Sequence, residues 1–187
     1  MEQSEPRTPT RILRDEHEVI LRVLNAFESM LHRIEDGSPP DKEALRNAVE
    51  FFRGFADGCH HAKEEDCLFP AMERAGLPTQ GGPVGIMLEE HEQGRAYIQE
   101  IRRAVEENPP DARKRMIDNG WAYIQLLRAH IHKENEILFP LADKSVPEPA
   151  MKAVARDFEA AEAARGEGET HEHFLSLARE LEAKAGL

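Results

Sequence analysis

One pattern occurs twice in this chain, and it limits the possible folds more than any other feature. The two copies read HHAKEEDCLFP at residues 60–70 and HIHKENEILFP at residues 130–140. Aligning the Leu-Phe-Pro ends places His60 over His130 and Glu64 over Glu134. A shorter match precedes each copy: DEHE contains His17, and EEHE contains His91. Such an internal repeat predicts two related structural units that pack together.

Breaker residues divide the sequence into long helical segments. Glycine and proline at DGSPP, at LPTQGGPVG and near Pro147 cannot continue a helix. We expect Asn108 to cap the fourth helix, with Pro109 at its first position. One or two shorter helices should follow in the last forty residues, and no stretch alternates as a strand would. The predicted long helices cover residues 9–35, 41–75, 84–107 and 109–143.

Each predicted helix places a polar group within its apolar stripe. His17 lies among Leu13, Ile20 and Leu24, and His91 lies between Met87 and Ile98. His60 with Glu64, and His130 with Glu134, continue the apolar stripes of the other two helices in the same way. Such stripes face the core of a helical protein. The pattern therefore predicts that four histidines and two glutamates point inward.

The fold class that follows is all-α. Two helical hairpins, each with the order His, His-x-x-x-Glu and Leu-Phe-Pro, would form an antiparallel four-helix bundle with pseudo-twofold symmetry. We expect this bundle to cover residues 10–145. Residues 146–187 would form a C-terminal helical extension that packs on the bundle.

Charge and cysteine content narrow the partners and the compartment. A net charge of −12 argues against a nucleic-acid partner and against an anionic membrane surface. No apolar run is long enough for a transmembrane helix, and the N-terminal residues do not resemble a secretory signal. Cys59 and Cys67 are too close on one helix for an obvious disulfide. The expected location is therefore the cytoplasm.

The inward polar residues suit a metal site. His and Glu four residues apart lie on one helix face, so both can reach one ion or a close pair of ions. Imidazole and carboxylate ligands together favour a first-row transition metal. The alternative is that each histidine is a hydrogen-bonded core residue and each His-x-x-x-Glu is a surface pair. Two buried glutamates without cations would cost several kcal/mol each, which favours the metal.

These motifs resemble the hemerythrin-like (HHE cation-binding) domains, in particular the bacterial ones. The resemblance covers roughly residues 10–145 and rests on HHAKEEDCLFP, GIMLEEHEQGR and LLRAHIHKENEILFP. It implies a non-haem centre of two iron ions with an oxo or hydroxo bridge and bridging carboxylates. Carried over by motif, the metal ligands would be His17, His60, Glu64, His91, His130 and Glu134.

The chain departs from the oxygen-carrying members of that family in two ways. A second histidine one turn along the third helix is missing, because Met87 and Arg95 occupy the flanking positions. Glu134 also stands four residues after His130, where the carriers have an aspartate five residues after. His61 and Tyr123 are candidates for a further ligand, although the alternative of a core or solvent position is favoured for each.

Two functional hypotheses follow from this resemblance. One is a di-iron protein that binds a diatomic ligand, O2 or NO, for sensing, storage or delivery. The alternative is a di-iron oxidoreductase acting on peroxide or nitric oxide, or an iron donor for damaged iron centres. Both share the same ligands, so the sequence leaves open whether the protein is an enzyme. It also leaves open a protein partner for redox or signalling, and the oligomeric state.

Overall fold

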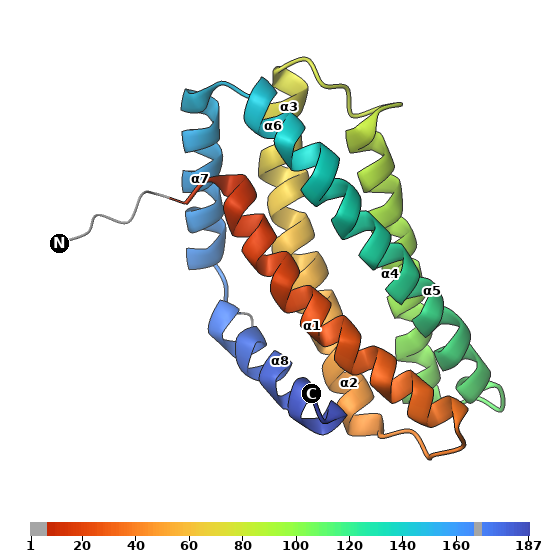
Figure 1. Cartoon of the computed structure of the whole chain (residues 1–187). Coiled ribbons are helices and arrows are strands. Elements are labelled where there is room, and N and C mark those ends of the chain that lie inside the picture. Colours follow the sequence, from red (N-terminus) through yellow and green to blue (C-terminus); the bar gives the residue numbers. More distant parts are fainter. Residues whose placement is uncertain (1–6, 167–169) are drawn as a thin grey trace.

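The protein folds into a bundle of long, antiparallel helical arms (Figure 1). The computed structural model describes residues 7–166 and 170–187, and within them it contains helices and no strand. The predicted all-α bundle is therefore confirmed. The α-helices are α1 (Pro9–Glu35), α2 (Lys42–Phe51), α3 (Phe69–Arg74), α4 (Pro83–Glu107), α5 (Ala112–Lys133), α6 (Phe139–Ser145), α7 (Glu148–Ala163) and α8 (His171–Ala185).

Two of the four arms are composite. The second arm runs through α2, two π-helical segments and α3, and the fourth runs through α5, one π-helical segment and α6. The π-helical segments are η1 (Phe52–His61), η2 (Glu64–Leu68) and η3 (Glu134–Leu138). The prediction of one regular helix over residues 41–75 is wrong in this respect, because apolar spacing does not reveal a local change in helical pitch.

The repeated prolines explain two of the π-helical segments. Proline has no N–H, and its ring clashes with the carbonyl group four residues before it. Pro70 and Pro140 follow η2 and η3, and the N–H groups of Phe69 and Phe139 bond to the carbonyl oxygens five residues back. The wider turn relieves the clash without ending the arm. Rare π-helical turns of this kind often mark functional sites.

Two of the long arms begin at a side-chain cap, and one predicted cap is misplaced. The side chains of Thr8 and Asp41 accept hydrogen bonds from backbone N–H groups at the starts of α1 and α2. The predicted N-cap at Asn108 is wrong: this residue ends α4 in a left-handed conformation, with φ 48°. Asparagine tolerates that conformation better than most residues, so it can act at either end of a helix.

A polar layer divides the hydrophobic core into two clusters. The larger cluster includes Ile20, Phe52 and Tyr123 and extends to Phe174 of α8. The smaller cluster includes Leu13, Phe69 and Phe139 and extends to Phe158 of α7. Along the sequence, five of the six ligands predicted by motif lie between a residue of one cluster and a residue of the other. The sixth, His130, directly precedes Ile131, the last residue of the larger cluster on its arm.

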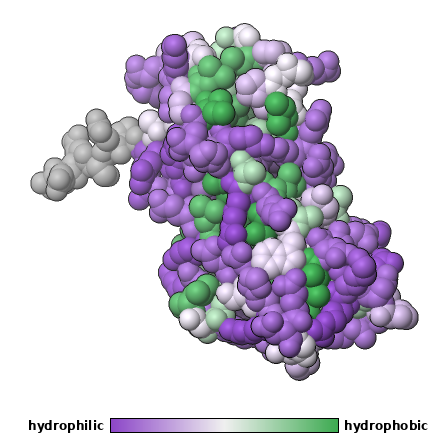
Figure 2. All heavy atoms as spheres, turned by 45° about the vertical axis from the view of Figure 1, so that its right-hand side comes forward, coloured by the Kyte–Doolittle hydropathy of each residue, from purple (hydrophilic) through white to green (hydrophobic). Residues whose placement is uncertain are grey.

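Helices α7 and α8 pack on the outside of the bundle. Helix α8 lies along α1 and α2, and its Phe174 sits where a side chain at Gly54 would be: an added Cβ would come within 2.2 Å of its ring. Helix α7 lies against η2, α1 and α3. The face in Figure 2 is mostly hydrophilic, with hydrophobic residues in separate groups. Among the described residues, no helix is long and apolar enough to cross a membrane.

Candidate metal centre

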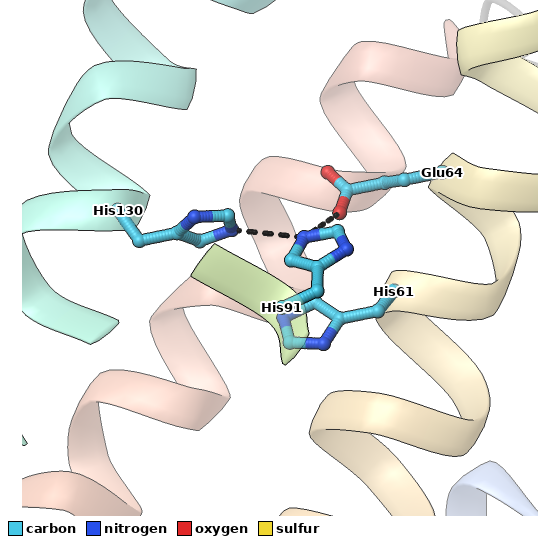
Figure 3. Close-up of side chains that lie close together, drawn as sticks. All are labelled: His61, Glu64, His91 and His130. Carbon is cyan, nitrogen blue, oxygen red and sulfur yellow. Dashed lines mark hydrogen bonds and ion pairs between the residues drawn. The ribbon is translucent and has the colours of Figure 1, made fainter. Parts of the chain in front are cut away.

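Five histidines and two glutamates meet between the two core clusters. They form two groups whose potential ligand atoms all lie within 4.8 Å of one another. Figure 3 shows one group, in which His91 and His130 converge beside Glu64 and His61. All seven side chains are buried, from 0% to 5% exposed. One group contains His61, Glu64, His91 and His130, and the other contains His17, His60, Glu64 and Glu134.

Each glutamate directs one oxygen to each group. Oε1 of Glu134 lies 3.2 Å from Nε2 of His130, and its Oε2 lies 3.1 Å from Nε2 of His17. Oε2 of Glu64 lies 3.5 Å from Nε2 of His91, and its Oε1 lies 3.7 Å from Nε2 of His60. Both carboxylates therefore span the space between the two groups.

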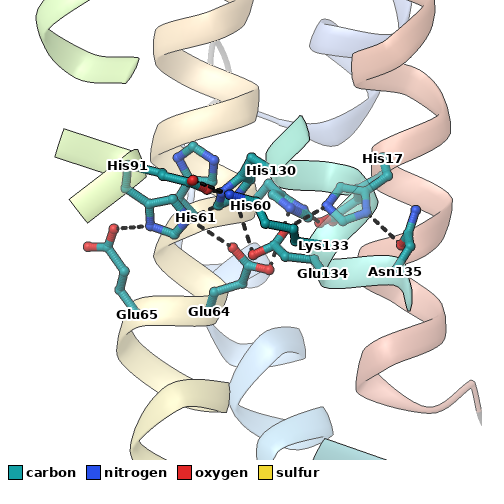
Figure 4. A network of polar contacts seen from close by, with 12 residues as sticks. His17, His60, His61, Glu64, Glu65, His91, His130, Lys133, Glu134 and Asn135 are labelled. Atoms are coloured by element: carbon teal, nitrogen blue, oxygen red, sulfur yellow. Dashed lines mark hydrogen bonds and ion pairs between the residues drawn. The ribbon is translucent and has the colours of Figure 1, made fainter. Parts of the chain in front are cut away.

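The outer nitrogen of each of the five histidines has a hydrogen-bond acceptor, and Figure 4 shows Asn135 beside His17 and Glu65 beside His91. Four of the acceptors are carboxylates and the fifth is the amide oxygen of Asn135. Because these oxygens accept, Nδ1 carries the proton, and Nε2 then presents its lone pair to the interior. Such partners fix the orientation of metal-binding imidazoles. The pairs are His17–Asn135 at 3.0 Å, His60–Glu16 at 3.0 Å, His61–Asp57 at 3.3 Å, His91–Glu65 at 2.6 Å and His130–Glu90 at 3.0 Å.

Two of these acceptors reproduce the sequence repeat. Glu16 stands before His17 and accepts from His60, while Lys63 forms an ion pair with it. Glu90 stands before His91 and accepts from His130, while Lys133 forms an ion pair with it. The two Lys-Glu-His chains therefore occupy equivalent positions in the two halves.

Their surroundings differ. The Lys63 side chain is 6% exposed and lies over the ring of Phe158, so α7 covers this chain. The Lys133 side chain is 35% exposed and Glu90 is 15% exposed. The hydrogen-bonded set that contains Lys63 is thus enclosed by the C-terminal extension. The set that contains Lys133 reaches solvent.

Each of the two repeated phenylalanines covers one histidine of the centre. The Phe139 ring stacks on His17, with ring centroids 5.4 Å apart, and the Phe69 ring stacks on His91 at 6.0 Å. Both phenylalanines are almost completely buried. The repeated Leu-Phe-Pro motif therefore supplies a core leucine, an aromatic cover for one histidine and the proline behind a π-helical turn.

His61 breaks the symmetry of the two halves. Its counterpart in the second copy is Ile131, a buried core residue. His61 reaches the interior from η1, where the wider π-helical turn lets both it and His60 face inward. Its ring stacks on His91 with centroids 3.8 Å apart. One group therefore has three histidines and the other has two.

Arg95 stabilises this asymmetric side. Its Nε donates to Asp57 at 2.8 Å, and its terminal nitrogens donate to Glu65 and Glu92 at 2.6 Å. Asp57 holds His61, and Glu65 holds His91. A single guanidinium therefore positions two acceptors that orient two histidines. Arg95 stands one turn after His91, at a position where the oxygen carriers were expected to have a histidine.

Charge in the metal-free centre is balanced by protons. Burial and the adjacent Glu134 raise the pKa of Glu64 well above its usual range. Burial also acts against ionisation of Glu134, but His130 and His17 outweigh it and lower its pKa well below the usual range. The same competition lowers the pKa of Glu16 to about 2, where His60 and Lys63 prevail over burial. Glu134 is therefore the ionised carboxylate of the central pair.

The structure brings together all six residues that the motif predicts. It adds His61, which the sequence left open, and it places Tyr123 outside both groups, in the wall of a neighbouring cavity. Sequence reasoning missed the acceptors Glu16, Glu90, Glu65, Asp57 and Asn135. A signal existed for two of them, because the DEHE and EEHE copies and the aligned lysines repeat together.

The donor set fits a metal. Nε2 of His17, His60 and His61 and all four oxygens of Glu64 and Glu134 are buried without a hydrogen-bond partner. Buried polar atoms normally have partners, so this cluster of unpaired donors and acceptors needs an explanation. Two adjacent ligands that each lie about 2.1 Å from one ion lie roughly 3 Å from each other. The distances from the Glu134 oxygens to Nε2 of His17 and of His130, 3.1 Å and 3.2 Å, approach this value.

Comparison with known proteins decides the family. The model of the hemerythrin HHE cation-binding domain matches residues 8–142. The chain belongs to this family. The family is named for a cation-binding domain, and the five histidines and two glutamates that could hold a cation lie within the matched residues. No solved structure matches the chain.

Individual proteins match the chain at modest identity or over only part of its length. An uncharacterised protein of Mycobacterium tuberculosis is 25% identical over 163 residues, which is 84% of this chain and 62% of that protein. The iron-sulfur cluster repair protein YtfE of Dickeya chrysanthemi is 38% identical over 89 residues, and that of Escherichia coli is 36% identical over 89 residues. These matches cover 44% of this chain and 40% of each repair protein.

Proposed function

We propose that this chain is a non-haem di-iron protein that binds a small diatomic ligand, O2 or NO. One observation carries the proposal: five imidazoles, each held through Nδ1, direct Nε2 toward the same space as two carboxylates. Five nitrogens and four oxygens exceed the six positions of one octahedral ion, which supports two ions. His61, His91 and His130 would hold one, His17 and His60 the other, and Glu64 and Glu134 would serve both.

Mixed nitrogen and oxygen donors are typical of iron sites of this kind. Iron bound there would supply open coordination positions and redox states for a diatomic ligand. The residues of the chain supply the rest. Phe69 covers His91 and Phe139 covers His17 on the side of the smaller core cluster, and the hydrogen-bond acceptors keep each histidine in one tautomer. The group of two histidines has fewer donors, so we infer that the exogenous ligand binds on that side.

Anaerobic reconstitution with ferrous iron tests this function. We expect two irons per chain and an absorption band on exposure to O2 or NO that disappears when the gas is removed. One iron per chain, or none, would contradict the di-iron assignment. Oxidation that does not reverse would contradict ligand storage and delivery and would favour turnover.

The two free thiols are compatible with the cytoplasmic location that we infer.

A second candidate is donation of iron to damaged iron centres. Its support is the similarity to iron-sulfur cluster repair proteins over 44% of the chain. The two candidates differ in how firmly iron is held. Transfer of both irons to a metal-free iron-sulfur protein within minutes, with no reversible gas binding, would favour donation. Iron that stays bound while a strong ferrous chelator is present would exclude it.

A further inference from the structure

A cavity lies beside the group of three histidines. Its volume is about 210 Å3, and it is bordered by residues of η1, α4 and α5. His61, His91 and His130 form its inner end, and the exposed residues Arg53 and Gln99 lie at its border with solvent. Apolar residues line much of the rest: Phe52, Ile98, Leu126 and Leu127.

This cavity is larger than a diatomic ligand needs. A water molecule occupies about 30 Å3 of liquid, whereas an apolar cavity of about 150 Å3 in another protein holds a benzene molecule. The cavity here exceeds that volume. Its size and apolar wall therefore suit an organic molecule with the bulk of an aromatic ring.

Away from the histidines, the buried part of the wall contains a hydroxyl group that lacks a protein partner. Tyr123 is 3% exposed and lines the cavity, yet its hydroxyl forms no hydrogen bond with any residue in the described part of the chain. A buried tyrosine hydroxyl usually finds a partner. Among the charged groups of the wall, Arg95 is paired with Asp57, Glu65 and Glu92, and Glu90 is paired with Lys133. Arg53 forms no ion pair with the described residues, but it is exposed at the border with solvent.

Gly94 keeps the cavity open. Glycine within a helix costs roughly 1 kcal/mol relative to alanine, so a buried helical glycine needs a reason. A Cβ built on Gly94 would meet Tyr123 at 3.5 Å and Leu126 at 3.9 Å, which are ordinary contacts. No backbone clash excludes a side chain here. A larger side chain would occupy the space between α4 and the Tyr123 ring.

From these four features we propose that the cavity binds a small neutral organic molecule with one hydroxyl or hydroperoxyl group. The apolar body packs against Phe52, Ile98 and Leu127, and the oxygen group bonds to the Tyr123 hydroxyl next to the histidines. This ligand is additional to the diatomic one. Binding depends on the cavity itself, so it is measurable with or without iron.

Titration calorimetry with benzyl alcohol and toluene, on the full chain before and after iron loading, tests the proposal. We expect both probes to bind. Tyr123→Phe should weaken benzyl alcohol about two- to ten-fold, the value of one hydrogen bond, and leave toluene unchanged. Gly94→Val should weaken both probes at least ten-fold, roughly the effect of filling the site. Ala96→Val, on the exposed face of the same helix, is the matched control and should change neither.

Three results would overturn the proposal: no binding of either probe, equal binding in Gly94→Val, or equal loss of both probes in Tyr123→Phe. Far-UV circular dichroism checks the fold of each variant. If Gly94→Val does not fold, Gly94→Ala replaces it, because its Cβ fits without a clash and still reduces the volume. A protein that binds two irons and neither probe rejects the cavity ligand alone. A protein that binds both probes but takes up no iron on reconstitution rejects the di-iron function alone.

Discussion

The Nε2 atoms of His91 and His130 lie 3.2 Å apart, although the two rings come from different helices. Nδ1 of each ring donates to a carboxylate, that of Glu65 for His91 and that of Glu90 for His130. In two neutral rings, both Nε2 lone pairs would face each other. A proton on one ring, or a cation between them, removes that repulsion. In the metal-free protein the proton is on His130: burial lowers its pKa, but Glu134 and Glu90 outweigh burial and raise it to about 9.

Metal uptake should therefore release protons. At pH 7 His130 is protonated because its pKa lies above that pH, and the raised pKa of Glu64 makes this carboxyl keep its proton to a higher pH than an ordinary glutamate does. Both must lose their protons to act as ligands, so apparent affinity should increase with pH up to about 9. Titration of zinc into metal-free protein, in buffers of different ionisation enthalpy, counts the protons. Uptake without proton release would contradict this protonation pattern.

The two central carboxylates should respond differently to substitution. In metal-free protein at pH 7, Glu64→Gln should leave the melting temperature nearly unchanged, because glutamine resembles the protonated acid. Glu134→Gln should lower the free energy of unfolding by about 2–4 kcal/mol, since His130 and His17 lose a buried ionised partner. Both variants should lose the stabilisation that metal gives the parent protein. Thermal melts with and without metal measure this.

The exposed Glu136→Gln provides a control for the glutamate substitutions and should behave like the parent protein. Equal destabilisation by Glu64→Gln and Glu134→Gln would show that the proton is not held on Glu64. Full metal retention in both variants would remove the two carboxylates from the metal site.

His61 should be required for the ion on its side of the centre. His61→Ala leaves that side with His91, His130 and the two carboxylates, so iron content should fall from two per chain toward one. His132→Ala, in an exposed position on α5, is the matched control and should keep both irons. Iron analysis after gel filtration measures the content. Two tightly held irons in His61→Ala would show that His61 is not a metal ligand and only packs in the core.

The π-helical turn after Glu134 should matter to metal binding more than to folding. Pro140→Ala restores a backbone N–H and permits ordinary helical bonding, so metal-free protein should melt at the same temperature or higher. Straightening the turn would move Glu134 relative to His130, and we expect at least ten-fold weaker metal binding. Pro149→Ala, near the start of α7, is the control. Unchanged affinity in Pro140→Ala would mean that the turn is incidental to the site.

The sequence by itself determined the helical class, the four arms and six of the residues at the centre. The reason is that apolar period and repeated motifs are local properties: His17 and His91 lie in their stripes whatever packs against them. The sequence also fixed where the arms break, apart from Asn108, whose side chain suits either end of a helix.

Only the tertiary structure decided which donors share a group. His61 is adjacent to His60, and an ideal α-helix would turn it away. The π-helical pitch of η1 brings His61 inward, and Asp57 of the same segment holds it there. Arg95 of α4 in turn holds Asp57. Except for Asp57, which shares η1 with His61, the hydrogen-bond acceptors lie on arms other than those of the histidines they hold. Gly94 and Tyr123 likewise meet across α4 and α5. Such relations depend on packing between distant segments, which periodicity along one helix does not encode.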